Sequence, residues 1–312
     1  MDINENADLD TSQVEDVRGS GGGYVGGAGT PGGVGGIPIP IGGGKLGLII
    51  TVVVVLGMLI LGGTLGRGML GGDGSSGGGD LAEKCSTANP NRFQETDCRN
   101  LLYVNSIQAY WEKALPETFG RPYQKASTVF FSNAVNTGCG SADSGVGPFY
   151  CPVDRHVYID LTFYNELATR FGARGAFAQP YVLAHEYGHH VQNLLGTSDQ
   201  VRRAEQSDPT NANRYSVMLE LQADCYAGVW SKHATETTSA QGKPLFTRIT
   251  QEDIQQAVDT AAAIGDDTIQ KKMGGRVDES KFTHGTSAQR QHWLQEGYNT
   301  GNPKACDTFG NG

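Results

Sequence analysis

The stretch His185-Glu186-Tyr187-Gly188-His189 constrains this chain more than any other part of its sequence. On a helix, His185 and His189 lie four residues apart and project from one face, so both imidazoles can bind a single cation. Glu186 lies beside this pair, where a base for a metal-activated water belongs. Apolar residues at helical spacing through residues 176–195, followed by Gly196, predict that this stretch is a helix. The alternative is an ordinary helix with two hydrogen-bonded histidines.

A third ligand is expected, because a catalytic zinc site has three protein ligands and one open position. A histidine six residues after His189 is excluded, since that position is Leu195. The later segment 217–228 supplies Glu220 and Asp224, which share one helix face. Glu220 can bind the metal, and Asp224 can accept a hydrogen bond from a ligand histidine and fix its orientation. The alternative is two solvated acids, which the apolar neighbours make less natural.

The N-terminal third differs in composition from the rest of the chain. Residues 1–44 carry acids and then a run of glycine and proline with little to bury, which predicts a disordered head. Residues 45–65 form an apolar run long enough to cross a bilayer as one helix, so a lipid bilayer is an expected partner. A buried strand, a core helix and a cleaved signal peptide are the alternatives. Residues 66–80 are predicted to be a flexible linker, and residues 81–312 the folded domain.

All six cysteines follow the apolar run, and their even number on one side predicts disulfides in an oxidising compartment. The chain is therefore expected to be a single-pass protein of the cell membrane, with its N-terminus cytoplasmic and its folded domain extracytoplasmic. Six cysteines allow 15 connectivities. Local pairing favours Cys85–Cys98 and Cys139–Cys151, which leaves Cys225–Cys306. A cysteine zinc site is the alternative, but the sequence has no Cys-x-x-Cys pair.

The folded part is predicted to be an α+β domain, mostly helical with a small β-sheet. Helices are expected over residues 96–115, 162–171, 250–263 and 287–298, and strands over residues 126–131 and 156–161. The strand 156–161 is the candidate edge along which an extended substrate adds, with an ordinary core strand as the alternative. The formal net charge of −9 argues against nucleic acid as the main partner.

Two residues near the C-terminus are candidates for a catalytic donor. Peptide hydrolysis builds negative charge on the carbonyl oxygen, and either His284 or Arg290 could donate a hydrogen bond to it. For His284 the alternative is a capping and packing role.

Three sequence motifs make the chain resemble a known family. The runs Ala184-His-Glu-Tyr-Gly-His-His-Val-Gln192, Leu221-Gln-Ala-Asp-Cys-Tyr-Ala-Gly-Val-Trp230 and Thr283-His-Gly-Thr-Ser-Ala-Gln-Arg290 are similar to those of the bacterial family called putative neutral zinc metallopeptidases, within the gluzincin arrangement. This resemblance covers residues from about 85 to 306. It implies a zincin-like domain with one zinc ion that hydrolyses peptide bonds in protein or peptide substrates, with Glu186 as the general base.

Two other functions are compatible with the same residues. An amidase or peptidase that acts on cell-wall peptides would use the same site chemistry. A non-catalytic scaffold could retain zinc for structure alone. Glu186 argues against the scaffold, because a structural site does not need a base and usually has four protein ligands.

Overall fold

The computed structural model describes residues 1–19 and 81–310. Within these ranges the helices are α2 (Leu81–Lys84), α3 (Thr96–Phe119), α4 (Phe163–Thr169), α5 (Ala178–Leu195), α6 (Thr197–Ser207), α7 (Ala212–His233), α8 (Gln251–Ala263), α9 (Asp266–Lys272) and α10 (Ser287–Thr300). The strands are β1 (Asp2–Ile3), β2 (Val14–Asp16), β3 (Ser127–Phe131), β4 (Ala134–Thr137), β5 (Gly140–Asp143), β6 (Phe149–Cys151), β7 (His156–Asp160) and β8 (Phe246–Arg248). The predicted α+β class, mostly helical with a small sheet, is confirmed.

The predicted membrane helix over residues 45–65 and the linker over 66–80 lie outside the described residues. In residues 1–19 and 81–310, every helix is too short or too polar to span a bilayer.

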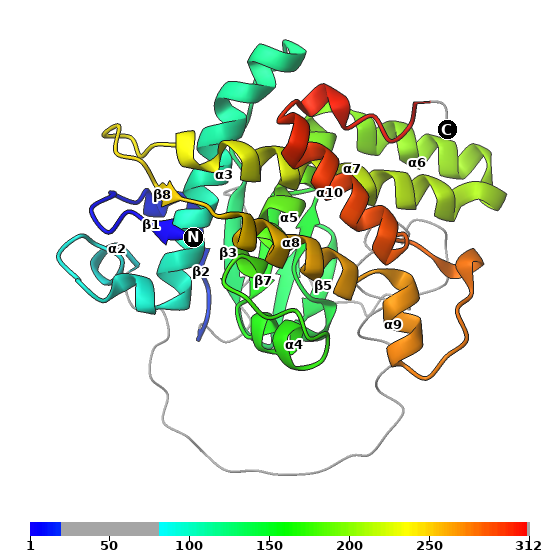
Figure 1. The fold of residues 1–312 in the computed structure, drawn as a ribbon, viewed down its shortest axis with the longest axis horizontal. Coiled ribbons are helices and arrows are strands. Elements are labelled where there is room, and N and C mark those ends of the chain that lie inside the picture. Colours follow the sequence, from blue (N-terminus) through cyan, green and yellow to red (C-terminus); the bar gives the residue numbers. More distant parts are fainter. Residues whose placement is uncertain (20–80, 311–312) are drawn as a thin grey trace, which may run out of the picture.

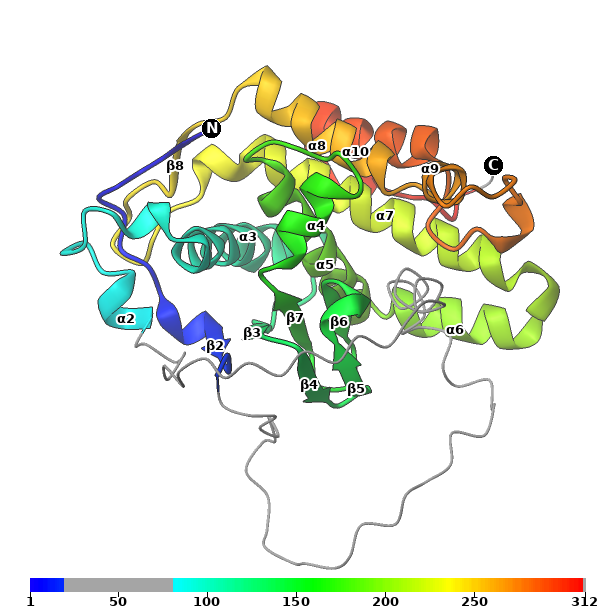
Figure 2. The ribbon, with the colours of Figure 1, turned by 90° about the horizontal axis from the view of Figure 1, so that it is seen from below.

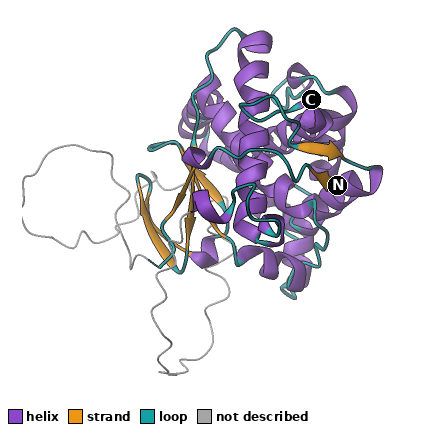
Figure 3. Ribbon diagram, turned by 90° about the vertical axis from the view of Figure 1, so that its left-hand side faces the viewer, coloured by secondary structure: helices purple, strands orange, loops and turns teal. Residues whose placement is uncertain are grey.

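The main sheet has four strands in the order β2-β3-β7-β6. Strands β2, β3 and β7 run parallel, whereas β6 is antiparallel to β7 and forms one edge. The expectation that the strand beginning at His156 is the substrate edge is therefore wrong, because β3 and β6 flank β7 on both sides. Figure 3 shows the sheet on one side of the molecule, helices filling the other, and the β1–β8 pair lying apart.

Helices α5, α7 and α10 position the site and pack one after another on one side of the sheet. Helix α5 contacts β6 and α3 on one side and α7 on the other, and α10 lies along α7 (Figures 1 and 2). Two glycines bring α7 and α10 into backbone contact: a Cβ on Gly297 would lie 1.9 Å from the Cys225 carbonyl oxygen, and one on Gly228 would lie 2.1 Å from that of Leu294. Only glycine permits so close an approach.

The prediction that residues 1–44 are disordered is wrong for the first 19. Strand β2 adds to the main sheet beside β3, and β1 pairs with β8, which follows it by more than 240 residues (Figure 2). Ala7 and Val14 are buried in the core. The composition of this segment is polar, and a polar segment is expected to be disordered. The segment is ordered because it pairs with backbone groups and with polar side chains far away in the sequence, and local hydrophobicity does not reveal such contacts.

Several local predictions are confirmed. Helix α5 ends at Gly196, whose φ of 82° is left-handed, and Thr250 forms a capping box with Asp253 at the start of α8. The three predicted disulfides, Cys85–Cys98, Cys139–Cys151 and Cys225–Cys306, are all present. Helix α3 runs four residues beyond the predicted end at residue 115. Pro116 does not stop the helix but lies in its last turn, and the helix ends at Gly120, which is left-handed.

Candidate metal centre

The site forms where α5 crosses α7. Gly188, in the middle of the histidine motif, faces Ala223 so closely that a Cβ on Gly188 would lie 3.0 Å from the Ala223 Cα. Two small residues at the crossing let the helix backbones approach, which brings Glu220 of α7 opposite the paired histidines of α5. The glycine between the two histidines therefore has a packing role that positions the third side chain.

The structure brings the three expected ligands together. The His185 Nε2 lies 3.1 Å from Glu220 Oε2, and the His189 Nε2 lies 3.1 Å from Glu220 Oε1. These separations are close to about 3.3 Å, the edge of a tetrahedron with metal–ligand bonds of ~2.0 Å. Glu220 is 1% exposed, yet its Oε1 has no hydrogen bond of acceptable geometry. A buried carboxylate oxygen without a hydrogen bond fits a cation better than a closed polar network.

Both ring nitrogens of His185 face carboxylate oxygens. Its Nδ1 lies 2.8 Å from Asp224 Oδ1, while its Nε2 faces Glu220. A neutral imidazole has one N–H, so the second position needs another proton or a cation. With the N–H donated to Asp224, the Nε2 lone pair points at the place where a metal would bind. The donor set of two imidazoles and one carboxylate fits zinc.

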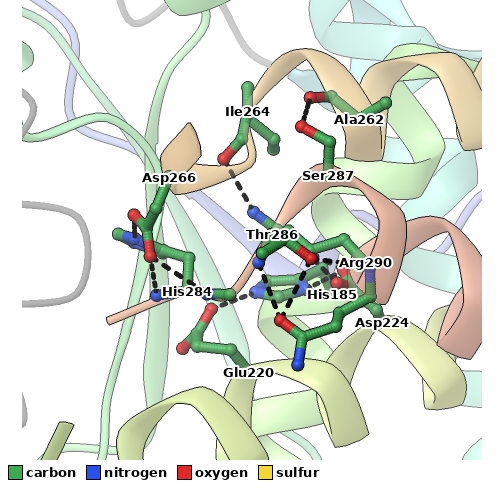
Figure 4. A network of polar contacts seen from close by, with 12 residues as sticks. His185, Glu220, Asp224, Ala262, Ile264, Asp266, His284, Thr286, Ser287 and Arg290 are labelled. Atoms are coloured by element: carbon green, nitrogen blue, oxygen red, sulfur yellow. Dashed lines mark hydrogen bonds and ion pairs between the residues drawn. The ribbon is translucent and has the colours of Figure 1, made fainter. Parts of the chain in front are cut away.

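Asp224 is held from three directions, as Figure 4 shows for two of its partners. Its Oδ1 accepts hydrogen bonds from the Tyr181 hydroxyl at 2.7 Å and from Arg290 Nη2 at 2.9 Å. Its Oδ2 accepts from Arg290 Nε at 2.8 Å. Asp224 is fully buried and Arg290 is 2% exposed. The predicted contact of Asp224 with a ligand histidine is thus present, and Arg290 of α10 fixes the carboxylate that orients His185.

Gln192 contacts the candidate ligands but was not predicted from the sequence. Its Oε1 accepts a hydrogen bond from the His189 Nδ1 at 2.9 Å, and its Nε2 donates to the Leu219 carbonyl at 2.7 Å. One amide therefore orients His189 and ties α5 to the residue before Glu220. The signal was present in the sequence, since a polar residue three positions after a helical ligand can reach its ring.

The charges of the site favour a cation there. Burial raises the pKa of Glu220, but the positive charges of His189 and His185 outweigh it and hold the pKa well below its usual value. Burial lowers the pKa of His185, but the charges of Asp224 and Glu220 outweigh it and raise the pKa above its usual value. The raised pKa of His185 shows that the two carboxylates favour positive charge at its ring, and the lowered pKa of Glu220 shows that positive charge beside it stabilises its ionised form.

Glu186 lies in a cavity of about 250 Å³ that also reaches His185 and Glu220. Burial raises the pKa of Glu186, although the neighbouring histidines lower it in part. The loop 145–148, which leads into β6, lines the same cavity. The other walls are largely apolar and come from Phe163, Phe171, Val182 and Ile264.

His284 also lines this cavity, while its Nδ1 lies 2.9 Å from Asp266 Oδ1. Asp266 is anchored in turn, because its Oδ2 accepts the backbone N–H groups of Thr283, His284 and Gly285. Figure 4 shows the His284–Asp266 pair on the far side of Glu220 from Arg290. Of the two candidate oxyanion donors, Arg290 is already bound to Asp224, whereas His284 has an Nε2 that Asp266 does not use.

His190 points away from the centre. Its Nε2 lies 2.6 Å from the Gln124 carbonyl, to which it donates, so its Nδ1 accepts from the Tyr150 hydroxyl at 3.0 Å. Burial lowers the pKa of His190 to about 4, so the ring is neutral in the fold near neutral pH.

Comparison with known proteins agrees with this geometry. The family described as "Putative neutral zinc metallopeptidase" matches residues 5–309, and the chain belongs to it. An uncharacterized protein of Mycobacterium tuberculosis is 47% identical over 234 residues, which cover 74% of this chain and 76% of that protein. An uncharacterized protein of Escherichia coli K12, YpfJ, is 38% identical over 306 residues, or 96% of both chains. No solved structure matches.

Proposed function

We propose that this chain is a zinc-dependent endopeptidase whose metal is held by His185, His189 and Glu220. The observation that carries the proposal is the convergence of these three side chains beside a buried Glu186, in a cavity open to a substrate. Membership of a zinc metallopeptidase family supports it. One zinc ion bound there would supply a Lewis acid that makes water nucleophilic near neutral pH.

Glu186 is the proposed general base. It follows His185 directly on α5, so its carboxylate faces the same cavity without belonging to the ligand set. It would accept the proton of the attacking water and pass that proton to the nitrogen of the leaving amine. A pKa raised by burial suits both steps, because the group must first take the proton and then release it.

His284 is the proposed donor to the carbonyl oxygen. Asp266 accepts the Nδ1 proton when the ring is neutral, whereas a donor to substrate must carry a proton on Nε2. The contact with Asp266 at Nδ1 leaves Nε2 for the substrate, and an N–H there would stabilise negative charge on the carbonyl oxygen as it develops.

The substrate is proposed to be an extended peptide that lies along the loop 145–148 and edge strand β6. Edge strands pair with an added strand through their free backbone groups, and β6 is an edge that packs beside α5. The apolar walls of the cavity favour an apolar side chain next to the cleaved bond. Three disulfides further support activity outside the cytoplasm, in an oxidising compartment.

The decisive experiment compares Glu186→Gln with the unaltered full-length chain, purified in detergent and supplied with zinc. Casein cleavage should fall by at least 10³-fold, roughly the upper part of the range for a lost general base, while bound zinc measured by mass spectrometry stays at one ion. Glu112→Gln, at an exposed position on α3, is the matched control and should keep full activity. Full activity in Glu186→Gln would reject the assignment. Zinc bound without any hydrolysis by the unaltered chain would favour the scaffold.

A further inference from the structure

We infer that residues 1–18, here called the N-terminal arm, are an integral part of the peptidase fold. The arm and residues 81–310 therefore lie in the same compartment, on one side of any membrane. This inference goes beyond the proposed activity and is independent of it. It rests on a continuous series of contacts along the arm, each made by a domain residue that is buried or largely so.

Arg92 holds the first part of the arm. Its side chain is 2% exposed and donates to three backbone carbonyls, those of Cys85 at 2.9 Å, Glu5 at 2.7 Å and Ala7 at 2.6 Å. Two of these three acceptors belong to the arm. Removing the arm would cost this guanidinium two of its three hydrogen bonds to backbone carbonyls, so the arm and the domain are joined by specific polar contacts.

Two amide side chains of α3 hold the middle of the arm. Asn105 accepts the Asp10 N–H at 2.7 Å and donates to the Asp10 carbonyl at 3.0 Å, so it pairs with both backbone groups of one residue. The buried Gln108 donates to Gln13 Oε1 at 2.9 Å. Such paired polar contacts specify one position of the arm, because a shift by one residue would leave several buried groups without partners.

The end of the arm completes the main sheet. Val14, Glu15 and Asp16 pair in parallel with Thr128, Val129 and Phe130 of β3, and the Val17 N–H donates to the Phe130 carbonyl at 2.9 Å. Figures 1 and 2 show this blue segment lying against the domain. Without the arm, β3 would become an exposed edge with unpaired backbone groups.

The two ends that flank residues 20–80 meet at one carboxylate. Asp97 Oδ2 lies 2.8 Å from Arg18 Nη2, at the end of the arm, and 2.9 Å from Lys84 Nζ, at the start of the domain. Asp97 is 3% exposed. The chain therefore leaves the described fold and returns to it at the same place.

This geometry bears on the expected membrane topology. A stretch that leaves one folded body and returns to it crosses a bilayer an even number of times or not at all. A cytoplasmic N-terminus and an extracytoplasmic domain are therefore incompatible with the docked arm. The family match begins at residue 5, so the arm belongs to the region that the family shares.

Cysteine labelling of the full chain in its membrane tests the inference. The six native cysteines are all in disulfides, so an introduced cysteine is the only thiol. Glu5→Cys marks an exposed position of the arm, and Val153→Cys marks the domain at a residue that is 71% exposed. A membrane-impermeant maleimide added to spheroplasts should label both variants or neither, and lysis should make both reactive. Labelling of only one variant before lysis would overturn the inference.

Docking itself is tested by comparing two arm positions. Ala7 is fully buried and Glu5 is exposed, so Ala7→Cys should react at least tenfold more slowly than Glu5→Cys. Equal rates would mean that the arm is not docked and would overturn the inference. Adding Arg92→Met should raise the Ala7→Cys rate severalfold. Arg121→Met, at an exposed arginine beyond the end of α3, is the control and should leave the rate unchanged.

Discussion

Replacing Arg290 by methionine should destabilise the fold by about 3–5 kcal/mol, the usual result of removing one partner from a buried ion pair. Methionine retains much of the side-chain volume but none of the donors. Arg290 supplies two of the hydrogen bonds that Asp224 accepts, and both residues are almost fully buried. After the change, the Asp224 carboxylate would remain in the core with only Tyr181 and His185.

The pKa of Asp224 gives the scale of this loss. Burial raises it, but the charges of Arg290 and His185 outweigh burial and lower it from 3.8 to about 2. That difference corresponds to about 2 kcal/mol of net stabilisation of the charged form, to which both Arg290 and His185 contribute. Because the folded-state pKa is depressed, the stabilisation is present above pH 3.8 and is lost as pH falls towards 2. Arg290→Met should remove most of this pH dependence.

Urea unfolding followed by far-ultraviolet circular dichroism, with zinc removed by a chelator and the disulfides intact, measures the loss. A double-mutant cycle with Asp224→Leu separates the pair from its surroundings. The double variant should be more stable than Arg290→Met alone, because it leaves no unpaired charge. Arg121→Met should fall within about 0.5 kcal/mol of the unaltered chain. A loss below about 1 kcal/mol for Arg290→Met, or simple additivity in the cycle, would refute the reasoning.

Three further changes test other contacts. Gln192→Ala should weaken zinc binding by roughly 10–100-fold, because His189 loses the amide that orients it; chelator competition measures this, with Gln179→Ala on the same helix as the control. His190 has a folded pKa of about 4, below its ordinary 6.5, so its contribution to stability is complete above pH 6.5 and falls by about 3 kcal/mol by pH 4. His190→Gln should abolish that part of the acid destabilisation, and an unchanged pH profile of unfolding would contradict this. Gly297→Ala should cost about 3 kcal/mol or more, because its Cβ would lie 1.9 Å from the Cys225 carbonyl oxygen; an unchanged urea midpoint would show that α7 and α10 can move apart to accommodate the methyl group without loss of stability.

The local part of the site could be predicted from sequence because helical spacing fixes which side chains share a face. His185 with His189, and Glu220 with Asp224, each lie four residues apart on one helix, and the structure places the two pairs together. The roles of Asp266 and Arg290 could not be read in this way. Their partners, His284 and Asp224, are 18 and 66 residues distant in sequence, so only the packing of α9 and α10 brings them together.

The sheet edges and the arm were predicted wrongly for a related reason. An alternating pattern identifies a strand but not its neighbours, so β7 could not be distinguished from an edge before β6 was known to flank it. The arm has few apolar residues, and its docking depends on Arg92 and Asn105, whose side chains find acceptors and donors about 90 residues away. Long-range polar pairing of this kind leaves little trace in local composition.

The glycine contact between α7 and α10 has a mechanical consequence. Helices whose backbones touch at Gly228 and Gly297 interlock, so neither can slide along the other without a steric collision. The two helices therefore move as one rigid unit, which carries Glu220, Asp224 and Arg290. The Cys225–Cys306 disulfide adds a covalent link to this unit. Any closure of the cavity around a bound ligand would therefore be made by the opposite wall, where the loop 145–148 and α4 face the cavity.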